Sequence, residues 1–455
     1  MAGPETRVAL LCLDPLADQT GTFRPFNYSV RKVQAAVIAN SSLRARVEVF
    51  DSGSKDAAEF VDRIEKFDPD VIGVSAYVWS FPTFIEVARQ LKARRPERTV
   101  IFGGPSARTE MFDLLPFRDG TRVVDALVLG EGEDIFQEIL ALRDRSREKL
   151  SALRGLAVSK GDSWYLTPEH SQPVLDGLAS PFQLGLVPSG KTAHLETFRG
   201  CPLSCKFCQW GDLKKTNRIF SIEYLVRELR AFQDLGMNGA MIVDAALNLN
   251  ARAFRNLRAA EREARFFRTA TLNAEIYPQY MTNDHLEFIA EIGGGADLGL
   301  GLQSYDRDVL GNVDRPFDAD RFERVVKDVL AIAPNTAVEI IVGLPGDSPD
   351  SFRRTFDRAM RLGASVHVFR CLVLPNALMS RSPASFAMVY DPMTLRMESC
   401  LGWKPGEIDA MSSELGDLVH ASDGAWQHND DNGWYFPSNS ERSRRLGMDV
   451  RHSEA

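Results

Sequence analysis

Residues 199–211 read Arg-Gly-Cys-Pro-Leu-Ser-Cys-Lys-Phe-Cys-Gln-Trp-Gly, a stretch that places Cys201, Cys205 and Cys208 at the spacing C-x3-C-x2-C. Secreted proteins spread their cysteines to close loops, whereas a tight cluster in a long chain indicates metal ligation in a reducing compartment. Three thiolates at this spacing hold three irons of a [4Fe–4S] cubane and leave the fourth iron open. Because electron-transfer clusters have four protein ligands, the open iron predicts a ligand from outside the chain.

Zinc and a purely structural cluster are the alternatives for these three thiols. A structural zinc site needs four protein ligands, and the nearest candidate for the fourth is His194, in the strand-like run before the motif. We therefore favour the iron–sulfur cluster. The other cysteines, Cys12, Cys371 and Cys400, lie far apart in the sequence, and we expect them to be small buried apolar residues.

The motif directly follows the first strand of a second alternating series, which begins near residue 191. Short apolar runs alternate with helical patterns such as Ile222–Leu235 and Pro349–Leu362. Six such units predict a partial (β/α)6 barrel, in which reactive groups lie at the carboxyl ends of the strands and the gap in the wall admits a large substrate. The predicted strands are Thr192–Thr197, Ala240–Val243, Thr269–Ala274, Asp297–Leu302, Ala337–Val342 and His367–Leu374.

The first 150 residues also alternate between apolar runs and amphipathic stretches. This order predicts an α/β doubly wound, Rossmann-like sheet, which binds ligands at the carboxyl ends of its strands. The predicted strands are Val8–Leu13, Val47–Phe50, Val71–Ser75, Val100–Phe102 and Ala126–Leu129, and the predicted helices are Val30–Asn40, Ala57–Phe67, Pro82–Arg94 and Ile135–Arg143.

Domain boundaries follow from these patterns. We expect a first domain over residues 1–150, a linker hairpin over 151–190, a barrel domain over 191–400 and a small carboxy-terminal region over 401–455. Aromatic and acidic side chains in that last region either line a substrate opening or pack on the surface. They are Trp426, His428, Asp430, Asp431 and Trp434.

The composition of the chain indicates which kinds of partner to expect. The chain has 455 residues and a net charge of −8 without a Lys/Arg-rich run, which disfavours a nucleic-acid partner. The start, MAGPETRVALLCLDP, has no basic region followed by a long apolar one, and no run of about 18 apolar residues occurs elsewhere. We therefore expect no signal peptide and no membrane helix, and a cytoplasmic location.

Several features of the barrel segment resemble the radical S-adenosylmethionine (SAM) superfamily over roughly residues 190–400. The motif follows the first barrel strand, Phe207 precedes the third cysteine, and Gly343-Leu-Pro-Gly-Asp-Ser348 comes later. The resemblance implies that SAM chelates the open iron. It also implies that an electron from a donor such as flavodoxin or ferredoxin cleaves SAM to a 5′-deoxyadenosyl radical, which abstracts a hydrogen from a small-molecule substrate.

The resemblance further implies SAM contacts at the ends of the barrel strands. The family often has Gly-Gly-Glu after the second strand, whereas this chain has Asp244-Ala-Ala, and Asp244 is still able to accept the methionine ammonium group. A glycine at 343 permits close approach of backbone to the adenosine. The expected SAM-binding residues are Phe207, Asp244, Glu275, Gln303, Ser304, Arg315 and Gly343.

The first domain is similar to that of the cobalamin-binding class of radical SAM enzymes, because it carries Gly-Gly-Pro-Ser-Ala at 103–107 and Leu-Gly-Glu-Gly-Glu at 129–133. The first histidine is His170, so this domain offers no imidazole below the cobalt. Tight turns or a mononucleotide site are the alternatives for the glycines. The expected cobalamin contacts are Asp14, Ser75, Tyr77, Trp79, Gly103, Gly104, Gly130, Glu131, Gly132 and Glu133.

The resemblance implies methylation of an unactivated carbon in a small natural-product intermediate, with the 5′-deoxyadenosyl radical and methylcobalamin as the reacting groups. A non-methylating member of the class, which performs ring contraction, cyclisation or carbon–sulfur bond formation, is the alternative. A methylthiotransferase is disfavoured because its first domain carries three further cysteines, whereas this one has only Cys12. The open iron disfavours a non-enzymatic cofactor-binding protein.

Overall fold

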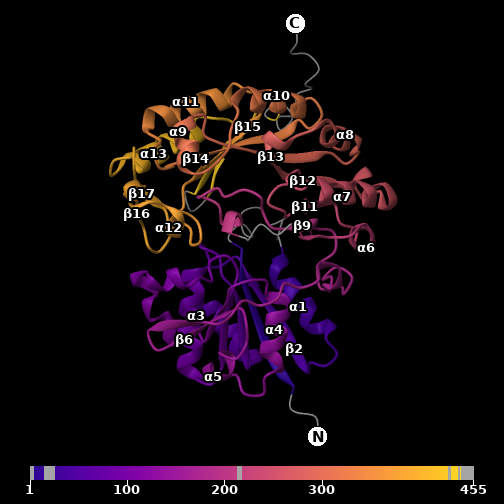
Figure 1. Cartoon of the computed structure of the whole chain (residues 1–455), viewed down its shortest axis with the longest axis vertical. Coiled ribbons are helices and arrows are strands. Elements are labelled where there is room, and N and C mark those ends of the chain that lie inside the picture. Colours follow the sequence, from indigo (N-terminus) through magenta and orange to yellow (C-terminus); the bar gives the residue numbers. More distant parts are fainter. Residues whose placement is uncertain (1–4, 15–25, 213–217, 429–431, 439–440, 442–455) are drawn as a thin grey trace. The chain divides into compact units, whose positions relative to one another are not determined.

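The computed structural model describes residues 5–14, 26–212, 218–428, 432–438 and 441. Contacts divide the chain into two compact units, Met1–Lys191 with Pro392–Thr394, and Thr192–Asp391 with Leu395–Ala455. Both are α/β units, shown in indigo to magenta and in magenta to yellow in Figure 1. Among the described residues, no helix has the length and apolar character needed to cross a bilayer.

The first unit contains a seven-stranded sheet of order β2-β1-β3-β4-β5-β6-β7, whose first five strands are parallel. Helix α1 packs with α4, and α2 packs with α3. The predicted doubly wound sheet is confirmed. Its strands are β1 (Thr6–Leu13), β2 (Ala45–Ser52), β3 (Val71–Ser75), β4 (Thr99–Gly103), β5 (Ala126–Val128), β6 (Leu156–Lys160) and β7 (Ser163–Leu166). Its helices are α1 (Tyr28–Ala39), α2 (Ala57–Phe67), α3 (Phe81–Arg94), α4 (Gly132–Ala141) and α5 (Arg147–Leu150), with short 3₁₀ helices at Thr109–Asp113, Leu115–Arg122 and Leu175–Gly177.

The hairpin in the predicted linker belongs to this first sheet. Strand β6 pairs antiparallel with β5, and β7 pairs antiparallel with β6. Leu156, Ala157 and Val158 of β6 are buried, so the hairpin both satisfies the open edge of β5 and extends the core. By their contacts, residues 151–190 belong to the first unit rather than to a separate linker. The predicted domain bounds therefore differ from the bounds of the two units.

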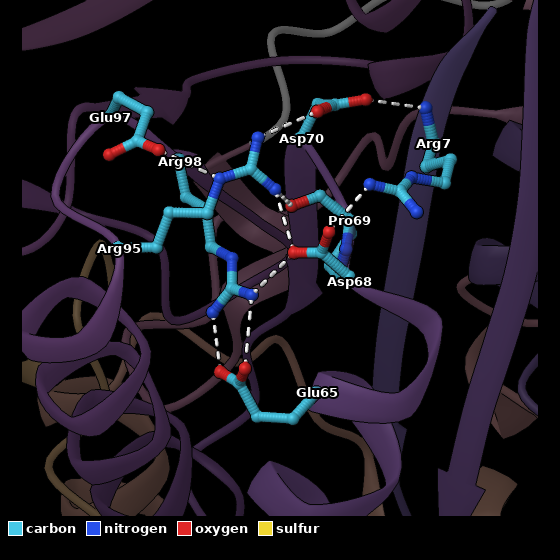
Figure 2. A network of polar contacts seen from close by, with 8 residues as sticks. All are labelled: Arg7, Glu65, Asp68, Pro69, Asp70, Arg95, Glu97 and Arg98. Atoms are coloured by element: carbon cyan, nitrogen blue, oxygen red, sulfur yellow. Dashed lines mark hydrogen bonds and ion pairs between the residues drawn. The ribbon is translucent and has the colours of Figure 1, made fainter.

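A network of ion pairs joins the amino-terminal ends of β1, β3 and β4 (Figure 2). Its centre is Arg98, whose side chain is 1% exposed and pairs with Glu65 at 2.5 Å and with Asp68 at 3.0 Å. Arg95 and Arg7 also pair with Asp68. Since the carboxylates remain partly exposed, the network stabilises this edge without burying an uncompensated charge. The opposite, carboxyl edge of the sheet is the one expected to bind a ligand.

We predict that Arg98→Met lowers the free energy of unfolding of the first unit by about 2 kcal/mol, because it removes hydrogen bonds to two carboxylates. Hydrogen bonds from Arg98 and the other two arginines hold the pKa of Asp68 at about 2, so the stabilisation from Asp68 is present near neutral pH and is lost as the pH falls toward that value. Hydrogen exchange of the β3 and β4 amides measures both effects. Arg122→Met, which breaks an exposed pair with Asp162, is the control, and an equal loss in both variants would contradict the prediction.

The second unit is built on an eight-stranded sheet of order β18-β19-β15-β14-β13-β12-β11-β8. Its strands are β8 (Thr192–Leu195), β11 (Gly239–Ile242), β12 (Thr271–Ile276), β13 (Ala296–Gln303), β14 (Asn335–Val342), β15 (Ser365–Arg370), β18 (Trp426–Gln427) and β19 (Gly433–Phe436). Two small pairs are β9 (Phe198–Arg199) with β10 (Arg218–Ile219), and β16 (Val389–Tyr390) with β17 (Met397–Ser399). The helices are α6 (Ile222–Asp234), α7 (Ala251–Ala264), α8 (Asn283–Glu291), α9 (Arg307–Asn312), α10 (Ala319–Leu330), α11 (Pro349–Met360), α12 (Leu378–Arg381) and α13 (Glu407–His420), with 3₁₀ helices at Gln209–Asp212, Phe266–Arg268, Pro278–Tyr280 and Ala384–Phe386.

The six strands from β8 to β15 are parallel, which confirms the predicted partial (β/α)6 barrel. In Figure 1, α7, α8, α10 and α11 lie on the outer side of these strands. Strand β19 continues the sheet antiparallel to β15, and β18 pairs antiparallel with β19, so the carboxy-terminal region extends the barrel sheet.

The aromatic side chains of that region divide between packing and exposure. Trp434 on β19 is fully buried, which supports the packing interpretation for this residue. Trp426 is 37% exposed and stacks on Tyr435 with ring centroids 5.2 Å apart. Asp430 and Asp431 lie outside the described residues.

Candidate active site

The three cysteines of the motif lie in the loop that follows β9. Cys201 and Cys205 are 7% and 4% exposed, and Cys208 is half-buried. All three line one cavity of about 240 Å³. Cys12, Cys371 and Cys400 are buried, as expected for structural cysteines.

Asp244, directly after β11, anchors the chain just before the motif. Its Oδ1 accepts hydrogen bonds from the backbone N–H groups of Thr197 at 2.9 Å and Phe198 at 3.3 Å, and its Oδ2 accepts from the Thr197 hydroxyl at 2.5 Å. Burial raises the pKa of Asp244 to about 7, and these hydrogen bonds oppose the rise. The structure thus places Asp244 at the cavity, as the sequence predicts, but with both oxygens engaged by the loop.

Two cationic side chains tie the motif loop to other segments of the second unit. Arg381, on α12, donates hydrogen bonds to the carbonyl oxygens of Cys205 at 3.1 Å and Cys208 at 2.5 Å. Lys206 donates to the Asn312 carbonyl at 2.9 Å and pairs with Asp314 at 3.2 Å. The sequence analysis missed Arg381, because no local pattern connects it to a motif more than 170 residues earlier in the chain.

Most of the predicted SAM-binding residues meet at this cavity. Phe207, Asp244, Glu275, Gln303 and Arg315 all line it. Two predicted residues lie outside its lining. They are Ser304, which is fully buried and accepts a hydrogen bond from the Asp306 N–H, and Gly343, which has a φ of +91° and lies beside Ile408 and Cys371. The lining also contains residues that the prediction omitted, among them Trp210, Tyr277, Gly301 and Glu339.

Arg315 extends along the cavity wall toward the cysteines. Its Nη2 donates to the Gly301 carbonyl at 2.5 Å, and its Nη1 lies 3.9 Å from the Sγ of Cys205. The guanidinium lies 4.8 Å from the ring centre of Tyr277 and 5.8 Å from that of Phe207. A Cβ at residue 301 would lie 2.7 Å from Nη2, so the glycine there makes room for the cation.

Glu275 on β12 and Glu339 on β14 form a carboxyl pair in the same cavity, on either side of β13. Glu275 is in register with Gly299, and Glu339 with Gly301. A Cβ at residue 299 would lie 2.6 Å from the Glu275 carboxyl, so both glycines clear space for charged groups. Burial raises the pKa of both carboxyls, and the charge of Glu275 adds to the rise at Glu339.

The three thiols fit an iron–sulfur cubane better than a single ion. Among the described residues, no three His, Cys, Asp or Glu side chains are arranged to hold one metal ion. A cubane spreads three thiolates over three separate irons, so its ligands stand farther apart than those of one zinc ion. Three thiols that line one cavity match that requirement.

The predicted cobalamin residues gather at the carboxyl edge of the first sheet. Gly104 has a φ of +95°, and a Cβ there would lie 2.9 Å from the Ala76 carbonyl, so this turn requires glycine. Beside Gly130, no atom of the described residues other than its two chain neighbours lies within 4 Å of the position of a Cβ. Glu131 caps α4, and Glu133 is buried in its first turn. Gly103 and Ser75 end neighbouring strands, Asp14 follows β1, and residues 15–25 lie outside the described part.

Tyr77 and Trp79 form a flat aromatic stack in the loop after β3. Their ring centres are 4.6 Å apart with planes 13° apart, and the Trp79 indole N–H donates to the Leu13 carbonyl at 3.1 Å. This bond ties the loop to the end of β1, at the point where the strand order reverses. Open space beside Gly130 together with a flat aromatic surface fits a broad planar macrocycle.

We predict that Asp244→Asn retains iron after anaerobic reconstitution, whereas Asp244→Ala loses a large part of it. Asparagine still accepts from the two N–H groups and donates to the Thr197 hydroxyl, but alanine leaves the buried donors unpaired, at about 1–3 kcal/mol each. Because the pKa of Asp244 is raised to about 7, its ionisation destabilises the folded loop as the pH rises from about 4 to 7. Thermal unfolding of the wild type and of Asp244→Asn should therefore diverge in that range, and identical pH profiles would contradict this.

Comparisons with known families agree with both halves of this arrangement. Residues 24–140 match the B12 binding domain, and residues 195–359 match the Radical SAM superfamily. Among solved structures, the radical SAM methyltransferase TsrM from Kitasatospora setae has a TM-score of 0.66 at 15% identity, covering 92% of this chain and 89% of TsrM. The cobalamin-dependent SAM radical enzyme OxsB has a TM-score of 0.62 at 13% identity, covering 95% of this chain and 64% of OxsB. At these low sequence identities, the two solved structures show a similarity of fold alone.

Two curated relatives share more sequence. The cobalamin-dependent radical SAM methyltransferase TokK of Streptomyces tokunonensis is 31% identical over 332 residues, 68% of this chain and 48% of TokK. The 2-(S-pantetheinyl)-carbapenam-3-carboxylate methyltransferase of Streptantibioticus cattleyicolor is 30% identical over 329 residues, with the same shares. The aligned part thus spans about half the length of each relative. Both family matches, in this order on one chain, show that the protein joins a B12 binding domain to a domain of the Radical SAM superfamily.

Proposed function

We propose that this enzyme methylates an unactivated carbon of a small-molecule natural-product intermediate. The observation that carries the proposal is the presence, on one chain, of a three-thiol cavity in an open barrel and a B12-type sheet. The names of the two 30–31% identical relatives, both methyltransferases, support methyl transfer over the other outcomes of this class.

We assign three roles to the residues around the cavity: ligands of the cluster, contacts to SAM and support of the motif loop. When bound, the cluster and SAM supply a 5′-deoxyadenosyl radical, and cobalamin supplies the transferred methyl group. Cys201, Cys205 and Cys208 would hold the cluster, and the burial of Cys201 and Cys205 would limit access of water and oxygen. We assign SAM contacts to Phe207, Glu275, Gln303 and Arg315, which line the cavity, and support of the loop before the motif to Asp244. Ser304 and Gly343 lie outside the lining, and we assign them no contact.

In the first unit, we assign cobalamin contacts to the strand-end residues that the sequence predicts. Gly130 and its neighbours provide space, and Ser75 provides a hydrogen-bonding group. Tyr77 and Trp79 supply a flat aromatic surface where other cobalamin domains supply a histidine. The described residues before His170 contain no imidazole for that role.

We also propose the compartment and the electron donor of the enzyme. Free thiols and an oxygen-sensitive cluster fit the cytoplasm, with a one-electron donor such as flavodoxin or ferredoxin as partner. The net charge of −8 supports a small-molecule substrate rather than a nucleic acid.

Anaerobic reconstitution with iron, sulfide and hydroxocobalamin tests the proposal. We expect about four irons and one cobalt per chain after desalting. With a reductant, SAM and 2-(S-pantetheinyl)-carbapenam-3-carboxylate as a first candidate acceptor, S-adenosylhomocysteine and 5′-deoxyadenosine should both form. The triple variant with alanine at residues 201, 205 and 208 is the control. 5′-Deoxyadenosine without S-adenosylhomocysteine, over a panel of related acceptors, would favour the non-methylating alternative.

We predict that Trp79→Ala weakens cobalamin retention about tenfold, because it removes one ring of the stack and the bond to Leu13. Cobalt content after desalting and the visible spectrum measure the loss, while iron content should not change. Trp426→Ala, in the second unit, is the matched control. Equal cobalt retention in both variants would exclude Trp79 from the cobalamin site.

A further inference from the structure

We infer that Glu275 and Glu339 act as one proton-sharing pair that recognises the positive sulfonium of SAM and releases its shared proton when SAM occupies the cavity. The inference rests on the proposed function, because it requires SAM in this cavity. It assigns to the pair a role in specificity: distinguishing SAM from S-adenosylhomocysteine, which has nearly the same shape and lacks the sulfonium charge.

The strand register brings the two carboxyls together. Glu275 and Glu339 come from strands that both pair with β13, and the β13 positions beside them are Gly299 and Gly301. Since these glycines present no side chain, both carboxyls have room beside β13, and both line the same cavity. Two carboxyls in one cavity are able to share a proton, because a protonated carboxyl donates a hydrogen bond that an ionised one accepts.

The charged and titratable side chains near the pair do not supply a positive charge in place of the shared proton. Arg315 is the one Lys, Arg or His among the described residues that line the cavity, and its bonds go to Gly301 and toward Cys205. His367 on β15 is in register with Glu339, but burial lowers its pKa to about 3, so it is neutral. Both oxygens of Asp244 are engaged by the loop before the motif.

The pair therefore retains a proton at pH values where an isolated carboxyl is ionised. Burial raises the pKa of both groups, and the charge of Arg315 opposes the rise. Two ionised carboxylates side by side in a partly buried cavity repel each other strongly.

A positive ligand removes that repulsion. With the sulfonium in the cavity, both carboxylates are stabilised in their ionised form, and the shared proton passes to solvent. Linkage then requires SAM to bind more tightly as the pH rises, by up to about tenfold per pH unit while the free pair is protonated. S-adenosylhomocysteine carries no sulfonium, so its binding leaves the proton in place.

Isothermal titration calorimetry of the full chain with its cluster, in two buffers of different ionisation enthalpy, measures the released protons. In a series of pH values that starts where an isolated carboxyl ionises, we expect SAM to release up to about one proton per chain, and S-adenosylhomocysteine none. Glu339→Gln and Glu275→Gln should each bind SAM without proton release and reduce its preference over S-adenosylhomocysteine about tenfold. Glu414→Gln, which breaks an exposed pair with Arg353, is the matched control and should behave as the wild type.

Each other result overturns the inference. Equal proton release by SAM and S-adenosylhomocysteine would assign the effect to their shared ammonium and carboxylate groups. Release that persists in both glutamine variants, with iron content at the wild-type value, would exclude the pair as its source. If SAM does not bind to the cluster-loaded wild type, the proposed function fails together with this inference; if it binds without releasing a proton, only the inference fails.

Discussion

Parallel pairing of six strands is the constraint on which the candidate active site depends. Because β8 and β11–β15 run in one direction, their carboxyl ends lie at one edge, and the loops and side chains there meet although they are far apart in the sequence. The motif loop follows the first of these strands, and Asp244, Gln303 and Arg315 follow or end later ones. Loss of parallel register would separate every one of these groups.

Charged groups are used differently in the two units. At the amino-terminal edge of the first sheet, Arg98 is surrounded by carboxylates, and the ion pairs are complete within the protein. In the barrel cavity, Glu275 and Glu339 face each other, and Arg315 bonds to a backbone carbonyl beside them. The first arrangement stabilises a fold, because each charge has its partner. The second leaves carboxyl groups whose charge a bound cation would compensate, which is typical of a binding site.

Small residues allow these charges to approach. Gly299 and Gly301 on β13 leave room for Glu275 and Arg315, and Gly104 allows a turn against Ala76 that a side chain would block. In both units, therefore, glycines within or just after a strand make room for neighbouring groups. Substitution by alanine at 299 or 301 would displace a charged group rather than only strain the backbone.

The sequence by itself predicted Cys201, Cys205 and Cys208 as cluster ligands and determined the order of the two α/β units and most of the strands, because these depend on short spacings and local periodicity. It also predicted about half of the residues that line the cavity, from the motif and from their places at the ends of the strands. Only the tertiary structure assigned β6 and β7 to the first sheet, joined Arg381 to the motif, and paired Glu339 with Glu275. These contacts link distant segments through strand register and burial, which no local pattern records. The same holds for Asp244, whose position was predictable but whose hydrogen bonds to Thr197 and Phe198 were not.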